Sequence, residues 1–176
     1  MFQISNISKY FYDKKGDSKL DILSSPLFFG VLIIKIISSF FFASNYLVDY
    51  VAKFVNYYFI SGFQNPYEFF YKLGELQIFP YSRVMLWILS IPRIIFAPLL
   101  STNYNLVSNL EIFIYRIPIL LADIIIFIIL SRWLKTKKDK VLIYYWCSPI
   151  LFYINYIDGQ LDVIPIMLLF VSLYLL

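Results

Sequence analysis

Carboxylates, lysines, arginines and tyrosines supply the reactive side chains of this chain. Its 176 residues include no histidine and one cysteine, Cys147. These counts exclude an intrachain disulfide, a paired-cysteine zinc site, a Ser-His or Cys-His relay and a histidine-ligated metal. A general acid or base must therefore be a carboxylate, a lysine or a tyrosine.

Asp49 is the first candidate for a general base. It directly follows a long apolar stretch and stands between Tyr46 and Tyr50. A carboxylate at the edge of the hydrocarbon is partly desolvated, which favours proton uptake and suits a base. The alternative is an ordinary solvated aspartate at a helix end. Because Tyr50-Val51 follows, no adjacent second acid supports a metal site at this position.

The composition predicts that these groups belong to a membrane protein. Hydrophobic residues make up 61% of the chain, charged residues make up 15%, and the mean hydropathy is +0.74. A core of this size cannot bury so much apolar surface and leave a polar exterior, which excludes a soluble globular domain. The net charge of +4 comes from basic residues beside apolar runs, which indicates membrane topology and no nucleic-acid partner.

The apolar segments predict an all-α, polytopic transmembrane bundle in a single membrane domain. A span needs about 20 apolar residues. We expect a cytoplasmic tail over 1–25, spans over 26–48, 112–131 and 141–157, and the start of a fourth span over 163–176. A signal peptide is the alternative for the first run, which is longer than a signal's apolar region. Because the last run is too short to cross, we expect the N-terminal part of a longer chain.

Charged residues predict the side of the membrane that each end faces. The densest basic cluster follows the second span and comprises Arg132, Lys135, Lys137, Lys138 and Lys140. The positive-inside rule places this cluster and the N-terminus in the cytoplasm, and the base-free loop 158–162 outside. The count of crossings then requires that 84–100 does not cross. Pro92, Arg93 and Pro98 favour an interfacial helix there.

Residues 49–111 are predicted to form one outer segment with interfacial helices that lie on the membrane. The segment is rich in tyrosine and phenylalanine, whose rings suit the headgroup region. Apolar residues at helical spacing from Val51 to Phe59, with Lys53 and Asn56 opposite, predict a first interfacial helix.

A second short helix is predicted after Asn65. Asn65 fits the N-cap, Pro66 fits the first turn, and Glu68 completes a capping box. Gly74 fits the C-terminal stop.

Two charges fall inside the predicted spans, where an isolated charge costs about 2.5–3.5 kcal/mol. Lys35 follows Pro26 by nine residues and Asp123 precedes Ser131 by eight residues. These separations put the two charges about 13 Å and about 12 Å from the inner ends of their helices. The matched depths predict a structural ion pair, and a proton or ion path is the functional alternative.

Several short motifs follow one another along the chain. In chain order they are Asp49-Tyr50, Gly62-Phe63-Gln64-Asn65-Pro66-Tyr67, Phe79-Pro80-Tyr81, Val84-Met85-Leu86-Trp87, Ile91-Pro92-Arg93, Arg116, Ser148-Pro149 and Gly159-Gln160-Leu161-Asp162. Their order resembles the GT-C superfamily of integral-membrane glycosyltransferases. The last motif looks like the Gly-Gln-Phe-Asp loop of mannosyltransferase-like members, and the resemblance covers residues 26–176.

The resemblance implies inverting transfer of a hexose or mannose-like sugar from a polyprenyl-phosphate donor to a glycan, lipid or protein acceptor. The site would face outward, from the inner membrane if the cell is bacterial, among membrane lipids. Asp49 matches the family's acidic residue in the first outer loop and would deprotonate the acceptor. A divalent cation held by Asp49 and Asp162 is an open alternative.

The departing phosphate needs cationic partners. Arg116 is the first candidate because arginine binds phosphate oxygens through a planar fork, and snorkelling to the interface is the alternative. Arg83 and Arg93 are further candidates, although Ser82-Arg83 replaces the Gly-Pro or Pro-Pro of many relatives. The remaining residues expected to contact substrate are Tyr50, Asn65, Gln160 and Asp162.

A second hypothesis belongs to a different class of function. An aromatic, charge-bearing bundle also suits a non-catalytic membrane subunit of a complex that transports or assembles lipid-linked saccharides. In that case Asp49 would have no catalytic role.

Overall fold

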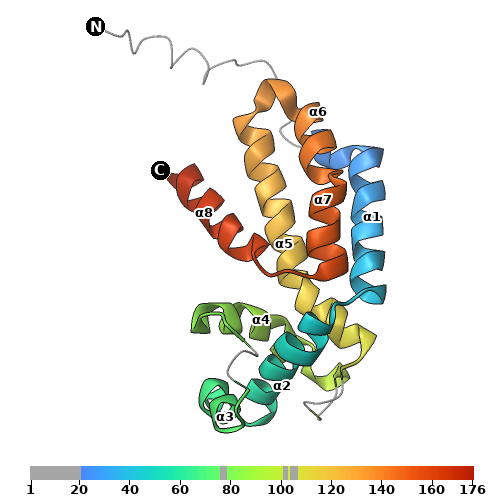
Figure 1. Cartoon of the computed structure of the whole chain (residues 1–176). Coiled ribbons are helices and arrows are strands. Elements are labelled where there is room, and N and C mark those ends of the chain that lie inside the picture. The colour runs from blue at the N-terminus through green and yellow to red at the C-terminus, as the bar shows by residue number, and fades with distance from the viewer. Residues whose placement is uncertain (1–20, 76–78, 101–102, 104–106) are drawn as a thin grey trace, which may run out of the picture.

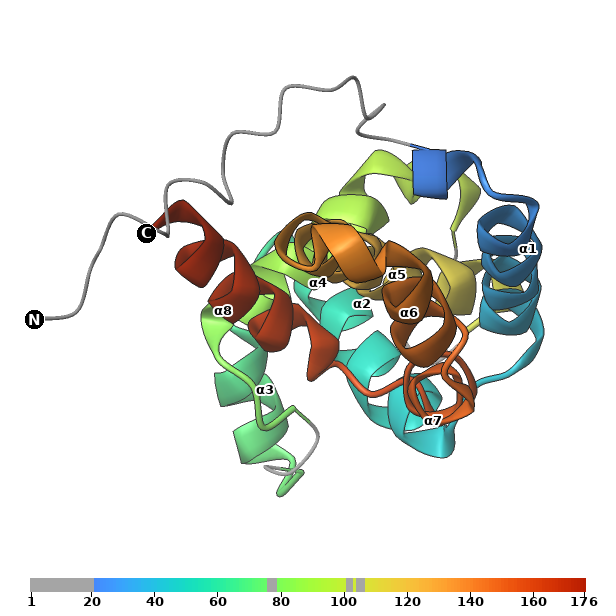
Figure 2. The ribbon, with the colours of Figure 1, turned by 90° about the horizontal axis from the view of Figure 1, so that it is seen from above.

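The computed structural model describes residues 21–75, 79–100, 103 and 107–176, and within them it contains helices and no strand. Helices α1 (Pro26–Phe41) and α5 (Asn109–Trp133) run beside a broken helical segment over 138–158 (Figure 1). Seen from above, α1 and α8 (Val163–Leu175) lie on opposite sides of α5 (Figure 2). The all-α prediction is confirmed for the described residues.

α5 is the central helix and the strongest membrane candidate. It begins with a capping box, in which Ser108 Oγ accepts from the Glu111 amide and Glu111 Oε2 accepts from the Ser108 amide at 2.8 Å. Among the described helices, α5 alone is both long and apolar enough to cross a membrane as one helix. Its 25 residues span about 37 Å, and the hydrocarbon layer is about 30 Å thick.

The predicted first span is not one straight helix. α1 ends at Phe41, and the chain then bends by 73° into the helical segment Tyr46–Ile60. This segment consists of a π-helix, η4 (Tyr46–Ala52), and α2 (Lys53–Ile60). The helix expected over 26–48 is therefore interrupted, because the non-helical residues 42–44 separate two helices that run in different directions. Neither α1 nor the segment Tyr46–Ile60 is long and apolar enough to cross a membrane by itself, but the two together are.

The predicted third span is also interrupted. It comprises α6 (Lys138–Val141), the π-helix η8 (Leu142–Trp146), α7 (Pro149–Phe152) and the π-helix η9 (Tyr153–Asp158). The break lies at Cys147 and Ser148, because Pro149 has no amide proton to continue the helical hydrogen bonds. Ser148 Oγ accepts from the Leu151 amide and restarts the helix.

A group of shorter helices packs across the Asn109 end of α5 (Figure 1). This outer group contains α2, α3 (Pro66–Lys72) and α4 (Arg83–Ile95). A short 3-10 turn, η6 (Ala97–Leu99), follows α4. α4 has 13 residues and is not among the candidate spans. A helix therefore exists within 84–100, but it ends at Ile95 and a separate 3-10 turn follows, and its position relative to a membrane stays a prediction.

The start and end of α3 follow the sequence signals, with one exception. Asn65 Oδ1 accepts from the Tyr67 amide at 3.2 Å, and Gly74 adopts a positive φ of 76° after the helix. The predicted capping box is wrong, because Glu68 accepts from Lys72 Nζ at 2.7 Å, one turn further along. The neighbouring ammonium lowers the pKa of this exposed carboxyl.

The sequence predicted that Asn56 lies on the exposed polar side of an interfacial helix, and this prediction is wrong. Its side chain is fully buried, and Oδ1 accepts hydrogen bonds from Arg93 Nε, at 2.8 Å, and from the Tyr115 hydroxyl. The polar face of α2 is covered because α4 and α5 pack on it, and the asparagine joins the three helices. Lys53 stays at the surface and pairs with Glu75 at 3.3 Å.

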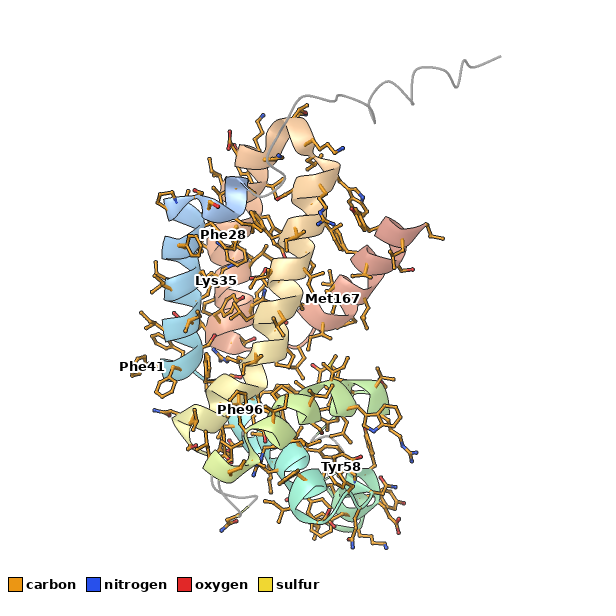
Figure 3. The ribbon with its side chains drawn as sticks, turned by 180° about the vertical axis from the view of Figure 1, so that it is seen from behind. Phe28, Lys35, Phe41, Tyr58, Phe96 and Met167 are labelled. Atoms are coloured by element: carbon orange, nitrogen blue, oxygen red, sulfur yellow. The ribbon has the colours of Figure 1, made fainter. Side chains whose placement is uncertain are left out.

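Lys35 and Asp123 form the buried ion pair that their matched depths predicted. Lys35 Nζ lies 2.8 Å from Asp123 Oδ2, and both side chains are about 2% exposed. Asp123 also accepts from the Tyr145 hydroxyl at 2.8 Å and from the Tyr156 hydroxyl at 2.7 Å. Lys35 Nζ sits 3.4 Å from the ring centroid of Trp146. Figure 3 shows Lys35 on the side of α1 that faces the bundle.

We expect Asp123→Ala to lower the free energy of unfolding by about 3–5 kcal/mol, because it leaves the Lys35 ammonium buried without a partner. The double variant Lys35→Met/Asp123→Asn should recover a large part of this loss, since the charge is removed as well. Thermal unfolding in detergent checks both expectations. Asp139→Ala, which removes an exposed carboxylate, is the matched control, and equal losses in Asp123→Ala and this control would contradict the pairing.

Candidate functional site

The candidate site lies where three separate stretches of chain meet at the outer end of the bundle. These stretches are the π-helix η4, which carries Asp49, the turn at 79–83 that leads into α4, and the loop 159–162 that leads into α8. Buried apolar residues of each stretch, Leu47, Phe79 and Leu161, belong to one core cluster. Figure 1 shows the connection into α8 beside the helical segment that leads into α2.

Asp49 faces solvent from η4. Leu47 and Val51 anchor this helix in the core, whereas Asp49 and Tyr50 are exposed. Asp49 makes no hydrogen bond or ion pair with another residue in the described part of the chain. Its carboxylate oxygens are therefore accessible to a substrate hydroxyl.

Arg116 does not offer an open guanidinium to a phosphate. The side chain is 1% exposed, Nη1 donates to the Tyr156 carbonyl, and Nη2 donates to the Ile157 carbonyl at 3.3 Å. These carbonyls lie at the end of η9, where a cation stabilises the helix terminus. The sequence predicted that Arg116 contacts the donor phosphate, with snorkelling to the interface as the alternative, but its guanidinium faces the 138–158 segment.

Arg93 is also enclosed by protein. Its guanidinium is 1% exposed, bonds to Asn56, lies 3.9 Å from Glu111 Oε1, and stands 4.8 Å from the Phe59 ring centroid. This contact set holds α4 against α2 and α5. A phosphate cannot reach Arg93 without disrupting these contacts.

Arg83 is the exposed arginine among the three candidates. It is the first residue of α4, and its charge acts on the Tyr67 hydroxyl. Burial raises the pKa of Tyr67, whereas the nearby Arg83 guanidinium lowers it. The Tyr67 hydroxyl donates to the Tyr81 carbonyl at 2.8 Å, which holds the turn at 79–83 against α3. Arg83 lies at the end of this turn and is therefore part of the candidate site.

The loop 159–162 is shaped by Gly159. This residue has a φ of 80°, and a Cβ built on it would lie 2.9 Å from Arg116 Nη2 and 3.4 Å from Leu47 Cδ2. The loop thus packs directly on both Arg116 and η4. Gln160 donates to Asp158 Oδ2 at 2.9 Å, while Asp162 is exposed. The other predicted amide contact, Asn65, has its side-chain oxygen occupied as the cap of α3.

Tyr81 joins the three stretches and was not among the residues predicted to contact substrate. Burial raises the pKa of its hydroxyl, a hydrogen bond with the Tyr46 hydroxyl lowers it, and the negative charge of Asp162 raises it. The hydroxyl therefore lies within the electrostatic reach of η4 and of the 159–162 loop. The sequence indicated a turn at Phe79-Pro80-Tyr81, but a turn alone does not show where the Tyr81 hydroxyl lies.

The candidate metal ligands Asp49 and Asp162 do not belong to a larger cluster of acidic or thiol side chains among the described residues. Within this part of the chain, no three carboxylate or thiol side chains gather closely enough to hold a metal ion. Asp49 and Asp162 would need further ligands from elsewhere. Comparisons of the chain with protein-family models, with curated proteins and with solved structures find no match.

We expect Gly159→Ala to destabilise the protein more than Gly62→Ala. Both glycines have a positive φ, which costs a residue with a Cβ about 1–2 kcal/mol, but a Cβ at Gly62 meets nothing within 4 Å. Only the change at Gly159 must also displace Arg116 from the end of η9. Thermal midpoints in detergent give the comparison, and equal midpoints for the two variants would show that the contact with Arg116 is unimportant.

Proposed function

We propose that the chain is a GT-C-like membrane glycosyltransferase that moves a sugar from a polyprenyl phosphate to an extracytoplasmic acceptor. The observation that carries the proposal is the packing of the segment with the exposed Asp49 against the Gly159–Asp162 loop. The first and the last of the motifs that carry the resemblance are more than a hundred residues apart in the sequence, yet they lie at the same end of the bundle. An accessible carboxylate at that end supports the role of base.

The proposed topology is a polytopic bundle with the outer group on the extracytoplasmic surface. The basic turn around Lys135–Lys137 lies at the opposite end of α5 from the outer group (Figure 1). The positive-inside rule assigns the basic end to the cytoplasm and therefore the Asp49 end to the outer face. Lipid contact is supported by exposed apolar side chains on α1, among them Leu27, Ile33, Ile34, Ile37 and Phe41.

In the proposed reaction Asp49 takes the proton from the acceptor hydroxyl. The acceptor oxygen attacks the anomeric carbon as the bond from that carbon to the phosphate oxygen breaks, and the leaving phosphate keeps the electron pair. The configuration inverts in a single displacement, so no covalent intermediate on the enzyme is needed. Asp162, which is exposed on the 159–162 loop, is assigned the role of orienting polar groups of the substrate.

The leaving phosphate is assigned to Arg83 and the start of α4. Arg83 is the exposed arginine of the three candidates, and Ser82 makes no side-chain cap on the helix. The first amides of α4 are therefore available, and the positive end of the helix dipole favours an anion there. Arg116 and Arg93 position the loop and α4 without contacting the phosphate.

We expect Asp49→Asn to lower sugar transfer by about 10²- to 10⁴-fold, the contribution of a positioned general base. Folding should be unchanged because Asp49 is exposed and has no partner in the described part of the chain. The assay follows a radiolabelled sugar from a polyprenyl-phosphate donor extract in membranes, at matched expression. Asp139→Asn, at the basic end, is the control. Full activity of Asp49→Asn would eliminate the proposed mechanism and favour the non-catalytic subunit hypothesis.

Labelling of single cysteines tests the topology. In a Cys147→Ser background, Gln64→Cys and Thr136→Cys introduce exposed thiols at the outer group and at the basic turn. A membrane-impermeant maleimide should label intact cells only at position 64 and reach position 136 after permeabilisation. Labelling of both positions in intact cells would contradict the assigned sidedness.

A further inference from the structure

A cavity opens between α5 and α6–η8 at the basic end of the bundle, away from Asp49. Its volume is about 340 Å³. Leu130 and Leu134 from the end of α5 form one wall, and Val141 and Tyr144 form the other. Two lysines, Lys137 and Lys140, also line the cavity. The cavity thus combines an apolar floor with a cationic rim.

The wall of this cavity is held by the buried core. Tyr145 also lines the cavity, and its hydroxyl donates to Asp123 Oδ1 at 2.8 Å. Val141 is buried at the base of the wall. Val141 and Tyr145 therefore tie one wall to the core, whereas Leu134, Tyr144 and the two lysines are exposed, so that the cavity is open to the surroundings of the bundle.

The rim carries positive charge that the described residues do not neutralise. Lys137 and Lys140 are exposed, and neither forms an ion pair with a carboxylate among the described residues. Arg132, Lys135 and Lys138 belong to the same turn, where Asp139 is the single acid between residues 132 and 141. The rim therefore favours an anion.

The proposed topology puts the cavity at the level of the cytoplasmic headgroups. In that topology the basic turn after α5 lies at the cytoplasmic surface, and the cavity lies beside it at the last turns of the helix. Leu130 lies within the last turns, and Lys137 and Lys140 follow the end of the helix. An apolar chain would lie toward Leu130, and a negative group would lie toward the lysines.

We propose that this cavity binds one anionic glycerophospholipid, with an acyl chain along the Leu130 and Val141 walls and the phosphate between Lys137 and Lys140. Basic pockets between transmembrane helices on the cytoplasmic side suit such headgroups. A free phosphate would gain nothing from the apolar walls, and a zwitterionic lipid brings a cation toward the lysines. The proposal rests on the membrane placement of the proposed function but not on sugar transfer.

The test measures binding of a fluorescent phosphatidylglycerol to the full chain in detergent micelles. Lys137→Gln/Lys140→Gln removes the two lining lysines, and Lys135→Gln/Lys138→Gln removes the same charge from the same turn outside the cavity. We expect the first pair to weaken binding about tenfold more than the second. Leu134→Trp, which fills the cavity without changing charge, should weaken binding as well.

Three results would overturn the proposal. The first is an equal loss of phosphatidylglycerol binding in the two double lysine variants. The second is binding of fluorescent phosphatidylcholine as tight as that of phosphatidylglycerol. The third is displacement of the phosphatidylglycerol probe by inorganic phosphate alone. Resistance of the chain to alkaline carbonate extraction tests membrane placement separately, and release into the soluble fraction would overturn both the placement and the lipid site. Asp49 is intact in every lysine variant, so a failure of the lipid site leaves the transfer assay unaffected.

Discussion

The carboxylate of Asp123 is the group on which the arrangement of the bundle depends. It accepts hydrogen bonds from Lys35, Tyr145 and Tyr156, so that one buried charge joins α1, α5 and the broken 138–158 segment. A buried ion pair stabilises a fold only when its remaining hydrogen-bonding capacity is satisfied, and here the tyrosine hydroxyls and the Trp146 ring complete it. The interruption at Pro149 is tolerated because η8 and η9 each contribute a tyrosine to this centre.

From that centre the contacts continue to the outer end of the bundle. Tyr156 bonds to Asp123 through its hydroxyl, and its backbone carbonyl accepts from Arg116. Arg116 in turn packs against Gly159, which fixes the start of the loop that carries Asp162. The centre of the bundle and the candidate site are therefore connected by direct contacts, and two of the three candidate arginines hold helices in place. Asp49, Arg83 and Asp162 are the charged site candidates that stay exposed at that end.

The two ends of α5 present different chemistry. The outer end has exposed carboxylates, one exposed arginine and tyrosine hydroxyls, a set that can handle a sugar hydroxyl and a leaving phosphate. The other end has a basic rim above an apolar cavity, a combination that suits a lipid. Tyr145 links this second end to the same Asp123, because its ring lines the cavity while its hydroxyl bonds to the carboxylate.

The sequence alone determined the helical class, the long apolar helix that became α5, the cap at Asn65, the stop at Gly74 and the pairing of Lys35 with Asp123. Each of these follows from local spacing or from the depth of a charge along one helix. The tertiary structure decided the bend after Phe41, the burial of Asn56, and the protein partners of Arg93 and Arg116. These outcomes depend on which helix covers which face, and a periodic pattern shows that a face is apolar or polar without showing what packs against it. For the same reason the sequence did not show that the charge of Asp162 acts on the Tyr81 hydroxyl.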